Sequence, residues 1–158
     1  MNITVIGVGK IKEKFFTDAL KEYSKRLGRF GSFEIIEIPD ESIPQNASEK
    51  QQEQIKKREG QKILSKLKPQ SLVISMCIEG KEVTSPELAG IISDAALKYG
   101  RVFFIIGGSL GLSEEVKRRS DMMHSFGRIT LPHQLMRVVL TEQIYRAFMI
   151  NSGSAYHK

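Results

Sequence analysis

Residues 101–115 read RVFFIIGGSLGLSEE, and this stretch decides the fold class. Its first six residues are rich in β-branched and aromatic side chains, which predicts a buried strand. A glycine-rich turn follows at Gly107, Gly108 and Gly111. Ser113 with two glutamates after it predicts a helix N-terminus. The stretch is therefore expected to form a strand, a tight turn and a helix in succession.

The same alternation continues on both sides of this stretch. Strands are predicted at 2–8, 33–38, 72–78 and 122–126, and helices at 13–27, 47–67, 85–99 and 133–151. The third of these helices is expected to begin with Ser85 as its N-cap and Pro86 in its first turn. Strands that alternate with helices predict an α/β fold whose mostly parallel sheet has helices on both faces. No linker or repeat divides residues 1–158, so one domain is expected.

Composition limits the class of protein. Of the 158 residues 41% are hydrophobic, and no apolar run approaches the roughly 20 residues that cross a bilayer. The apolar start of the chain is too short for a signal peptide and is interpreted as a strand. Cys77 is the one cysteine, so no internal disulfide can form, which fits a reducing cytoplasm. A cytoplasmic protein without a membrane partner is expected.

The net charge is positive, with 24 Lys and Arg against 18 Asp and Glu. Basic proteins tend to bind polyanions, because neutralising phosphates releases counterions. Many solvated surfaces carry a similar excess, so charge alone leaves nucleic-acid binding an open alternative.

The glycine turn at 107–111 allows two interpretations. Ligands of open α/β sheets bind beyond the carboxyl ends of the strands, and glycines let backbone approach a ligand closely. The spacing G-G-x-x-G is not that of a dinucleotide-binding loop, and Glu114 and Glu115 would repel a pyrophosphate. A purely structural strand-to-helix turn therefore remains the alternative to a ligand site.

Several kinds of catalytic centre are disfavoured. The three histidines, His124, His133 and His157, show no metal-ligand spacing, and Cys77 has no partner. The chain has neither a G-x-S-x-G nucleophile motif nor a P-loop. No metal is therefore expected.

The predicted helix 133–151 is apolar on two sides. Met136, Leu140, Ile144 and Ala147 line one side, and Val138, Tyr145 and Met149 line a nearly opposite side. A helix of this kind needs two surfaces to pack against. We expect a homodimer through this helix, because so small a chain is not expected to bury both sides; a central helix in one core is the alternative.

The last five residues, Ser154–Lys158, combine an aromatic ring, an imidazole and an ammonium. Such side chains can stack on a base and hold a phosphate. A chain terminus of this length otherwise frays in solvent.

Five motifs together resemble one family. They are G-K at 9–10, E-I-P at 37–39, I-G-G-x-x-G-L at 106–112, T-L-P-H-Q-L-M-R-V-V-L-x-E-Q-x-Y-R-A at 130–147, and the terminal A-Y-H-K. The chain resembles, over its whole length, the ribosomal large-subunit pseudouridine N3-methyltransferases, which are minimal SPOUT proteins.

The resemblance implies a C-terminal trefoil knot and S-adenosylmethionine as the cofactor, bound within the knot. The general rule that chains avoid knots would not have predicted this fold. The segments implied to hold the cofactor are the end of the third strand, the glycine turn and the loop before the last helix. Their residues are Met76, Gly107, Gly108, Phe126, Gly127, Arg128, Ile129, Thr130 and Leu131. Relatives often carry leucine at the position of Met76, which has a similar volume.

The resemblance also implies the substrate, a modified uridine in a hairpin loop of large-subunit ribosomal RNA, and we expect it to be reached in the assembled ribosome. Methyl transfer to N3 of such a ring needs its proton removed. Arg137 is expected to stabilise the resulting anion, His157 to accept the proton and Tyr156 to stack on the RNA. We expect Tyr156 and His157 to serve the cofactor pocket of the partner subunit.

Two alternatives from other classes remain at this point. The excess of basic over acidic residues also fits a non-catalytic RNA- or ribosome-binding module. The glycine turn also fits an oxidoreductase that binds a nucleotide. Neither accounts for the two-sided helix together with the terminal Tyr156 and His157.

Overall fold

The computed structural model describes all of residues 1–158, and its sheet has five strands, all parallel, in the order β2-β1-β4-β3-β5. The strands are β1 Asn2–Val8, β2 Ser32–Ile38, β3 Leu72–Glu82, β4 Arg101–Ile106 and β5 Met122–Ser125. The helices are α1 Lys14–Leu27, α2 Glu49–Leu64, α3 Ser85–Lys98, α4 Glu114–Arg119 and α5 His133–Asn151. The predicted α/β class is confirmed, and the sheet is parallel throughout.

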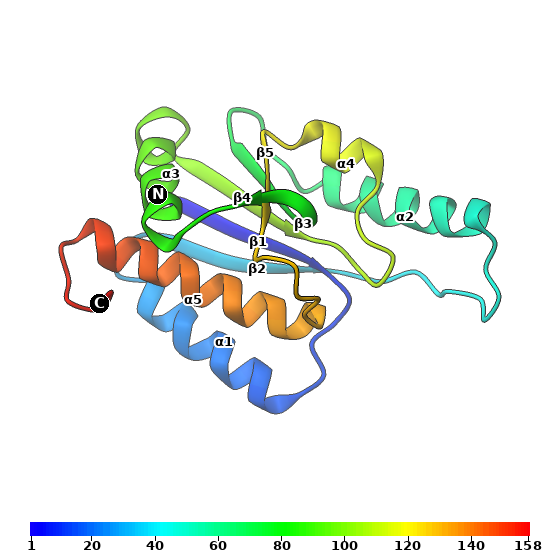
Figure 1. The fold of residues 1–158 in the computed structure, drawn as a ribbon, viewed down its shortest axis with the longest axis horizontal. Helices are drawn as coiled ribbons and strands as arrows, with labels where there is room; N and C mark the ends of the chain where they lie inside the picture. The colour runs from blue at the N-terminus through cyan, green and yellow to red at the C-terminus, as the bar shows by residue number, and fades with distance from the viewer.

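Helices cover both faces of the sheet, as predicted. Figure 1 shows α1, α3 and α5 on one side of the strands and α2 with α4 on the other. Side chains of β4 alternate between the two cores: Val102 and Phe104 pack under α3 and α5, whereas Phe103 and Ile105 pack under α2 and α4. Because both of its faces are buried, β4 is apolar from Val102 to Ile106, which is typical of a central strand in a parallel sheet.

The N-termini of α2, α3 and α4 are fixed by side-chain caps. Ser48 and Ser113 cap α2 and α4. The cap of α3 is Thr84, so the predicted Ser85 cap is wrong by one residue. Thr84 is favoured because its hydroxyl accepts from the Glu87 N–H while the Glu87 carboxylate accepts from the Thr84 N–H at 2.7 Å, a reciprocal capping box.

The third strand is longer than predicted. It continues to Glu82 instead of ending at residue 78, and its pairing with β5 is interrupted by a bulge. Both Met76 and Lys81 are paired with His124, so residues 77–80 are left out of the ladder. A Cβ on Gly80 would lie 2.6 Å from the His124 carbonyl carbon, so only glycine fits here. A sequence pattern of alternating burial does not reveal such an interruption.

The last helix lies between α1 and α3 and covers β1 and β4. Leu140, Ile144 and Ala147 are fully buried against the sheet, and Tyr145 on another side is 5% exposed. The expectation that one chain is too small to bury both sides is therefore wrong for Tyr145, which packs near Tyr23 and Phe30. Val138 and Met149 remain half-buried.

No helix of the structure combines the length and the apolar character that crossing a membrane requires.

Candidate active site

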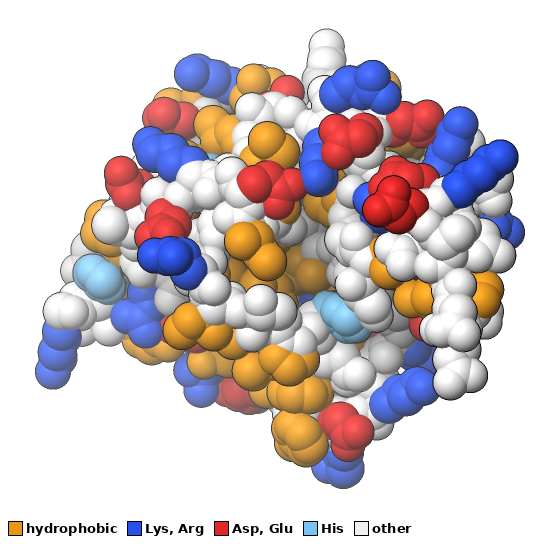
Figure 2. Space-filling model, turned by 45° about the vertical axis from the view of Figure 1, so that its right-hand side comes forward, with side chains coloured by type: hydrophobic (Ala, Val, Ile, Leu, Met, Phe, Trp, Pro, Cys, Tyr) orange, Lys and Arg blue, Asp and Glu red, His pale blue; other side chains and the backbone are white.

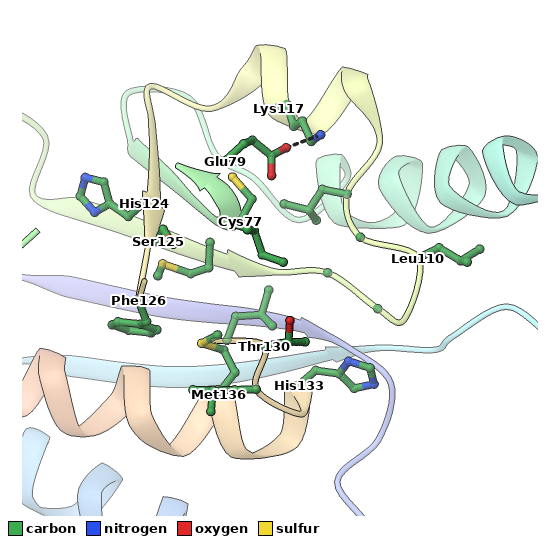
Figure 3. A pocket seen from close by; sticks show the side chains of 18 of the residues that line it. Cys77, Glu79, Leu110, Lys117, His124, Ser125, Phe126, Thr130, His133 and Met136 are labelled. Carbon is green, nitrogen blue, oxygen red and sulfur yellow. Dashed lines mark ion pairs between the residues drawn. The ribbon is translucent and has the colours of Figure 1, made fainter. Parts of the chain in front are cut away.

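A cavity of about 290 Å³ opens at the carboxyl ends of β3, β4 and β5. Figure 2 shows it as a hollow in the middle of one face, with hydrophobic side chains in it and along its lower rim. Figure 3 shows that its walls come from the end of β3, the turn after β4, the segment after β5 and the start of α5. Such a position is where open α/β sheets bind ligands.

The three segments expected to hold the cofactor all line this one cavity. The expected residues in its wall are Met76, Gly107, Gly108, Phe126, Gly127, Ile129, Thr130 and Leu131. Arg128 does not line it. Residues that were not expected at the cofactor site also line it, among them Lys117, His124, His133 and Met136.

The glycines of the turn are required by the protein itself. A Cβ on Gly107 would lie 2.9 Å from the carbonyl carbon of Gly111, because the turn folds back on itself. A Cβ on Gly108 would lie 3.1 Å from Val8 Cγ1 and 3.2 Å from the carboxylate of Glu59. Gly111 has a φ of 85°, which side chains disfavour. The two interpretations of the turn are thus compatible: it is a tight structural turn whose backbone also borders the cavity.

The bulge of β3 carries polar groups to the cavity. Cys77, Ile78 and Glu79 lie in its wall, and the Glu79 carboxylate pairs with Lys117 of α4 at 2.6 Å (Figure 3). The hydrogen bond with Lys117 lowers the pKa of Glu79 and raises that of Lys117. Burial raises the pKa of the Cys77 thiol. The sequence pattern did not assign these residues to a site, because the strand was expected to run regularly to residue 78 and the bulge at 77–80 was not foreseen.

His124 is the buried titratable group of the cavity wall. Its residue is 4% exposed, at the pairing point of the β3 bulge. Burial, and then the charge of Lys81, lower the pKa of His124. The imidazole is therefore neutral at pH 7.

Arg137 is buried and does not line the cavity. The side chain is fully buried, and Nη2 donates to the carbonyls of Val8 at 2.6 Å and Gly9 at 2.8 Å. Nη1 is 3.5 Å from Glu37 Oε1, whereas Nε has no partner. A Cβ on Gly7 would lie 2.4 Å from Nε, so glycine in β1 makes room for the guanidinium. Burial lowers the pKa of Arg137, and the Glu37 carboxylate opposes this.

The C-terminal residues pack on α5 of their own chain, away from its cavity. The Tyr156 ring meets Tyr145 edge-on at 5.1 Å between centroids, and the Arg146 guanidinium lies 4.8 Å from its centroid. The Tyr156 hydroxyl donates to Glu142 at 3.2 Å, and His157 Nδ1 is 3.4 Å from Arg146 Nη1. Neither terminal side chain lines the cavity of its own chain.

We predict that His124 makes the fold sensitive to mild acid. Its folded-state pKa is lowered, so below about pH 6.5 the unfolded chain binds a proton that the folded chain does not. The free energy of unfolding should therefore fall as the pH falls from 6.5 toward the lowered pKa. Urea unfolding at pH 7 and pH 5.5 measures this, and His124→Gln should lose less stability than the unsubstituted protein. The control His157→Gln, on the exposed tail, should keep the full loss; equal losses in both variants would contradict the assignment.

Comparison of this chain with known proteins identifies its family. A family model described as a predicted SPOUT methyltransferase matches residues 1–157. Two relatives named ribosomal RNA large subunit methyltransferase H, from Oenococcus oeni and Lactococcus lactis, are 55% and 56% identical; each alignment covers 100% of this chain and at least 99% of the relative. A solved structure titled as a probable methylase family protein from Haemophilus influenzae has a TM-score of 0.54 at 12% identity, covering 99% of this chain and 70% of that one, which bears on the fold alone. The chain belongs to the SPOUT methyltransferase family.

Proposed function

We propose that this protein transfers a methyl group from S-adenosylmethionine to N3 of a pseudouridine in a hairpin loop of large-subunit (23S) ribosomal RNA. The observation that carries the proposal is the single cavity that three separate segments build at the carboxyl end of the sheet. The full-length similarity to relatives named as large-subunit methyltransferases supports the RNA substrate.

The cavity wall suits the methyl donor. Apolar side chains from Ile106, Phe126 and Leu131 can enclose the adenine ring and the aliphatic part. The backbone of Gly107 and Gly108 borders the cavity without side chains and offers hydrogen-bonding groups. Once bound, the sulfonium supplies an electrophilic methyl group, so the protein has chiefly to position the reactants and exclude water.

The acceptor nitrogen must lose its proton for the attack. A splayed loop base can reach the open side of the cavity without disruption of a duplex. We propose that Tyr156 stacks on the RNA and that His157 receives the proton at one of its ring nitrogens. Within its own chain this pair packs against the C-terminal half of α5, away from the cavity. We therefore propose that it reaches the cavity of a partner subunit.

The proposed assembly is a homodimer through α5. Half-buried apolar side chains remain on this helix, at Leu135, Val138, Val139 and Met149, and they offer a surface for a second copy. The expected function of Arg137 in stabilising the substrate anion is harder to support, because its guanidinium bonds backbone carbonyls. We propose that Arg137 contributes by holding β1 against α5.

The proposed trefoil knot rests on the path of the chain. After β5 at the edge of the sheet, the segment 126–131, except Arg128, lines the cavity together with the bulged end of β3 and the glycine turn. The chain then returns as α5 under β4 and β1. We propose that on this return the chain threads through one of the preceding loops.

The direct test of the function is ribosomal RNA from cells with and without the gene. Mass spectrometry of nuclease fragments should show one pseudouridine of the large-subunit RNA lighter by a single methyl group when the gene is absent. Restoring the gene should restore the mass. An unchanged methylation pattern would refute the proposal.

We predict that Gly107→Ala weakens S-adenosylmethionine binding at least tenfold, because the added Cβ forces the turn away from Gly111. Titration calorimetry measures the affinity. The matched control is Gly90→Ala in α3, where a Cβ meets nothing within 4 Å. It should leave the affinity unchanged and raise stability by about 0.5–1 kcal/mol, as expected for a helical glycine. Equal affinities for both variants would show that the turn does not serve the donor.

The shared site is testable by complementation. One variant lacks residues 154–158 and the other carries Gly107→Val in the turn; each should be inactive alone. In a mixed dimer one site combines an intact cavity with an intact tail, so activity should return to a fraction of the unsubstituted level. Light scattering must show that each variant folds and dimerises, with Leu131→Arg as the substitute cavity variant. Verified subunit exchange without recovered activity would place the tail at its own chain's cavity or at none.

A further inference from the structure

The segment Lys10–Phe15, which joins β1 to α1, presents an unusual combination of side chains. Phe15 is 64% exposed although it is a large aromatic residue, and its ring centroid lies 4.3 Å from that of Phe16. Lys10, Lys12 and Lys14 on the same segment are exposed as well. An exposed aromatic ring among lysines is the composition of surfaces that bind single-stranded nucleic acid.

Two of these lysines take part in no ion pair, and the one acidic residue of the segment is the exposed Glu13. Lys14 pairs with Asp18 of the same helix, whereas Lys10 and Lys12 take part in no ion pair. Beneath the segment lies the fully buried Arg137, with Nε unpartnered. Lys10, Lys12, Lys14 and Arg137 outnumber the nearby carboxylates of Glu13, Asp18 and Glu37, and this excess of positive charge attracts phosphates.

The backbone of the segment is fixed before any ligand arrives. Arg137 donates to the Gly9 carbonyl, and Glu37 Oε1 accepts from the Ile11 N–H at 3.0 Å. The Lys12 N–H donates to Gln134 Oε1 of α5 at 3.3 Å. A surface held in this way does not have to be ordered on binding, which reduces the entropic cost.

The segment contacts the start of α5, which forms part of the cavity wall. Its contact residue Gln134 follows His133, which lines the cavity, and Figure 3 shows the His133 side chain directed toward the chain that leaves β1. The first turns of α1 and α5 contain no acidic residue and neither helix has a side-chain cap, although the N-cap residue of α1 is Glu13. Their free N–H groups add to the positive potential of the lysines.

We propose that the Lys10–Phe15 segment docks the ribosomal RNA strand next to the target nucleotide, with Phe15 stacked on a base and Lys10 and Lys12 on phosphates. This inference rests on the proposed function, because it names the surface that receives the same substrate. In this proposal the RNA outside the cavity is bound by a segment of the same chain, in addition to the tail of the partner subunit.

The test uses the full-length protein and ribosomes from cells that lack the gene. Phe15→Ala removes the ring, and the double variant Lys10→Gln with Lys12→Gln removes the two free charges. The matched controls are Leu97→Ala, which alters an 86% exposed side chain on α3, and Lys66→Gln with Lys68→Gln, an exposed and unpaired pair before the amino end of β3.

Phe15→Ala should raise the KM for ribosomes about tenfold, within the range found for loss of one stacked base. The kcat and the affinity for S-adenosylmethionine should stay within about twofold of the unsubstituted protein. The lysine variant should lower the dependence of log Kd on log salt by about 1.4, since each phosphate contact to a single strand contributes about 0.7. Both controls should match the unsubstituted protein.

A KM equal to that of the controls would overturn the proposal. A fall in molecular mass by light scattering for Phe15→Ala would also overturn it, because the segment would then contact a second copy. Binding of ribosomal RNA without the methyl donor is measured on the same variants. If the unsubstituted protein binds ribosomal RNA but does not methylate it, the proposed function fails. The binding affinities of the variants then still show whether the Lys10–Phe15 segment contacts the RNA.

Discussion

The buried guanidinium of Arg137 is the interaction on which the arrangement of the site depends. It joins the end of the first strand to the start of the last helix through two backbone carbonyls. A buried cation is costly unless it is paired and hydrogen-bonded, so this contact enforces one spacing between α5 and β1. Gly7 provides the space, and Glu37 supplies a nearby opposite charge. The cavity wall at His133 and Met136 takes its position from this contact.

The cavity itself follows from the topology of the sheet. Parallel strands end at the same edge, so the segments that follow β3, β4 and β5 meet there although up to about fifty residues separate them in sequence. Each segment reaches the edge by a different device: a bulge after Met76, a glycine turn after Ile106 and an irregular segment after Ser125. Irregular backbone at strand ends can border a ligand because its polar groups are not used in the sheet.

The positions of several strands and helices, and of many residues in the cavity wall, could be predicted from the sequence. Apolar strands such as 101–106 and the long helix 133–151 were predicted with their observed bounds, because their patterns are strong. The motif residues such as Met76 and Leu131 were predicted by resemblance, and they line one cavity. Glu79 and Lys117 were not predicted, because the β3 bulge and the ion pair depend on contacts distant in sequence. The burial of Arg137 was missed for the same reason: a helical wheel places it in a polar stripe, and only the packing against Val8 and Gly9 buries it.

The contact between Arg137 and the first strand also constrains how the chain folds during synthesis. The core that holds Ile3 and Val5 of β1 includes Leu140, Ile144 and Ala147 of α5, so the first strand emerging from the ribosome lacks part of its packing until the last helix has been translated. Its sheet neighbour β4 is also about a hundred residues away. Such non-local pairing slows folding. Nascent chains stalled before residue 137 should therefore remain open to proteolysis, and the protein should acquire its protected fold only at the very end of translation.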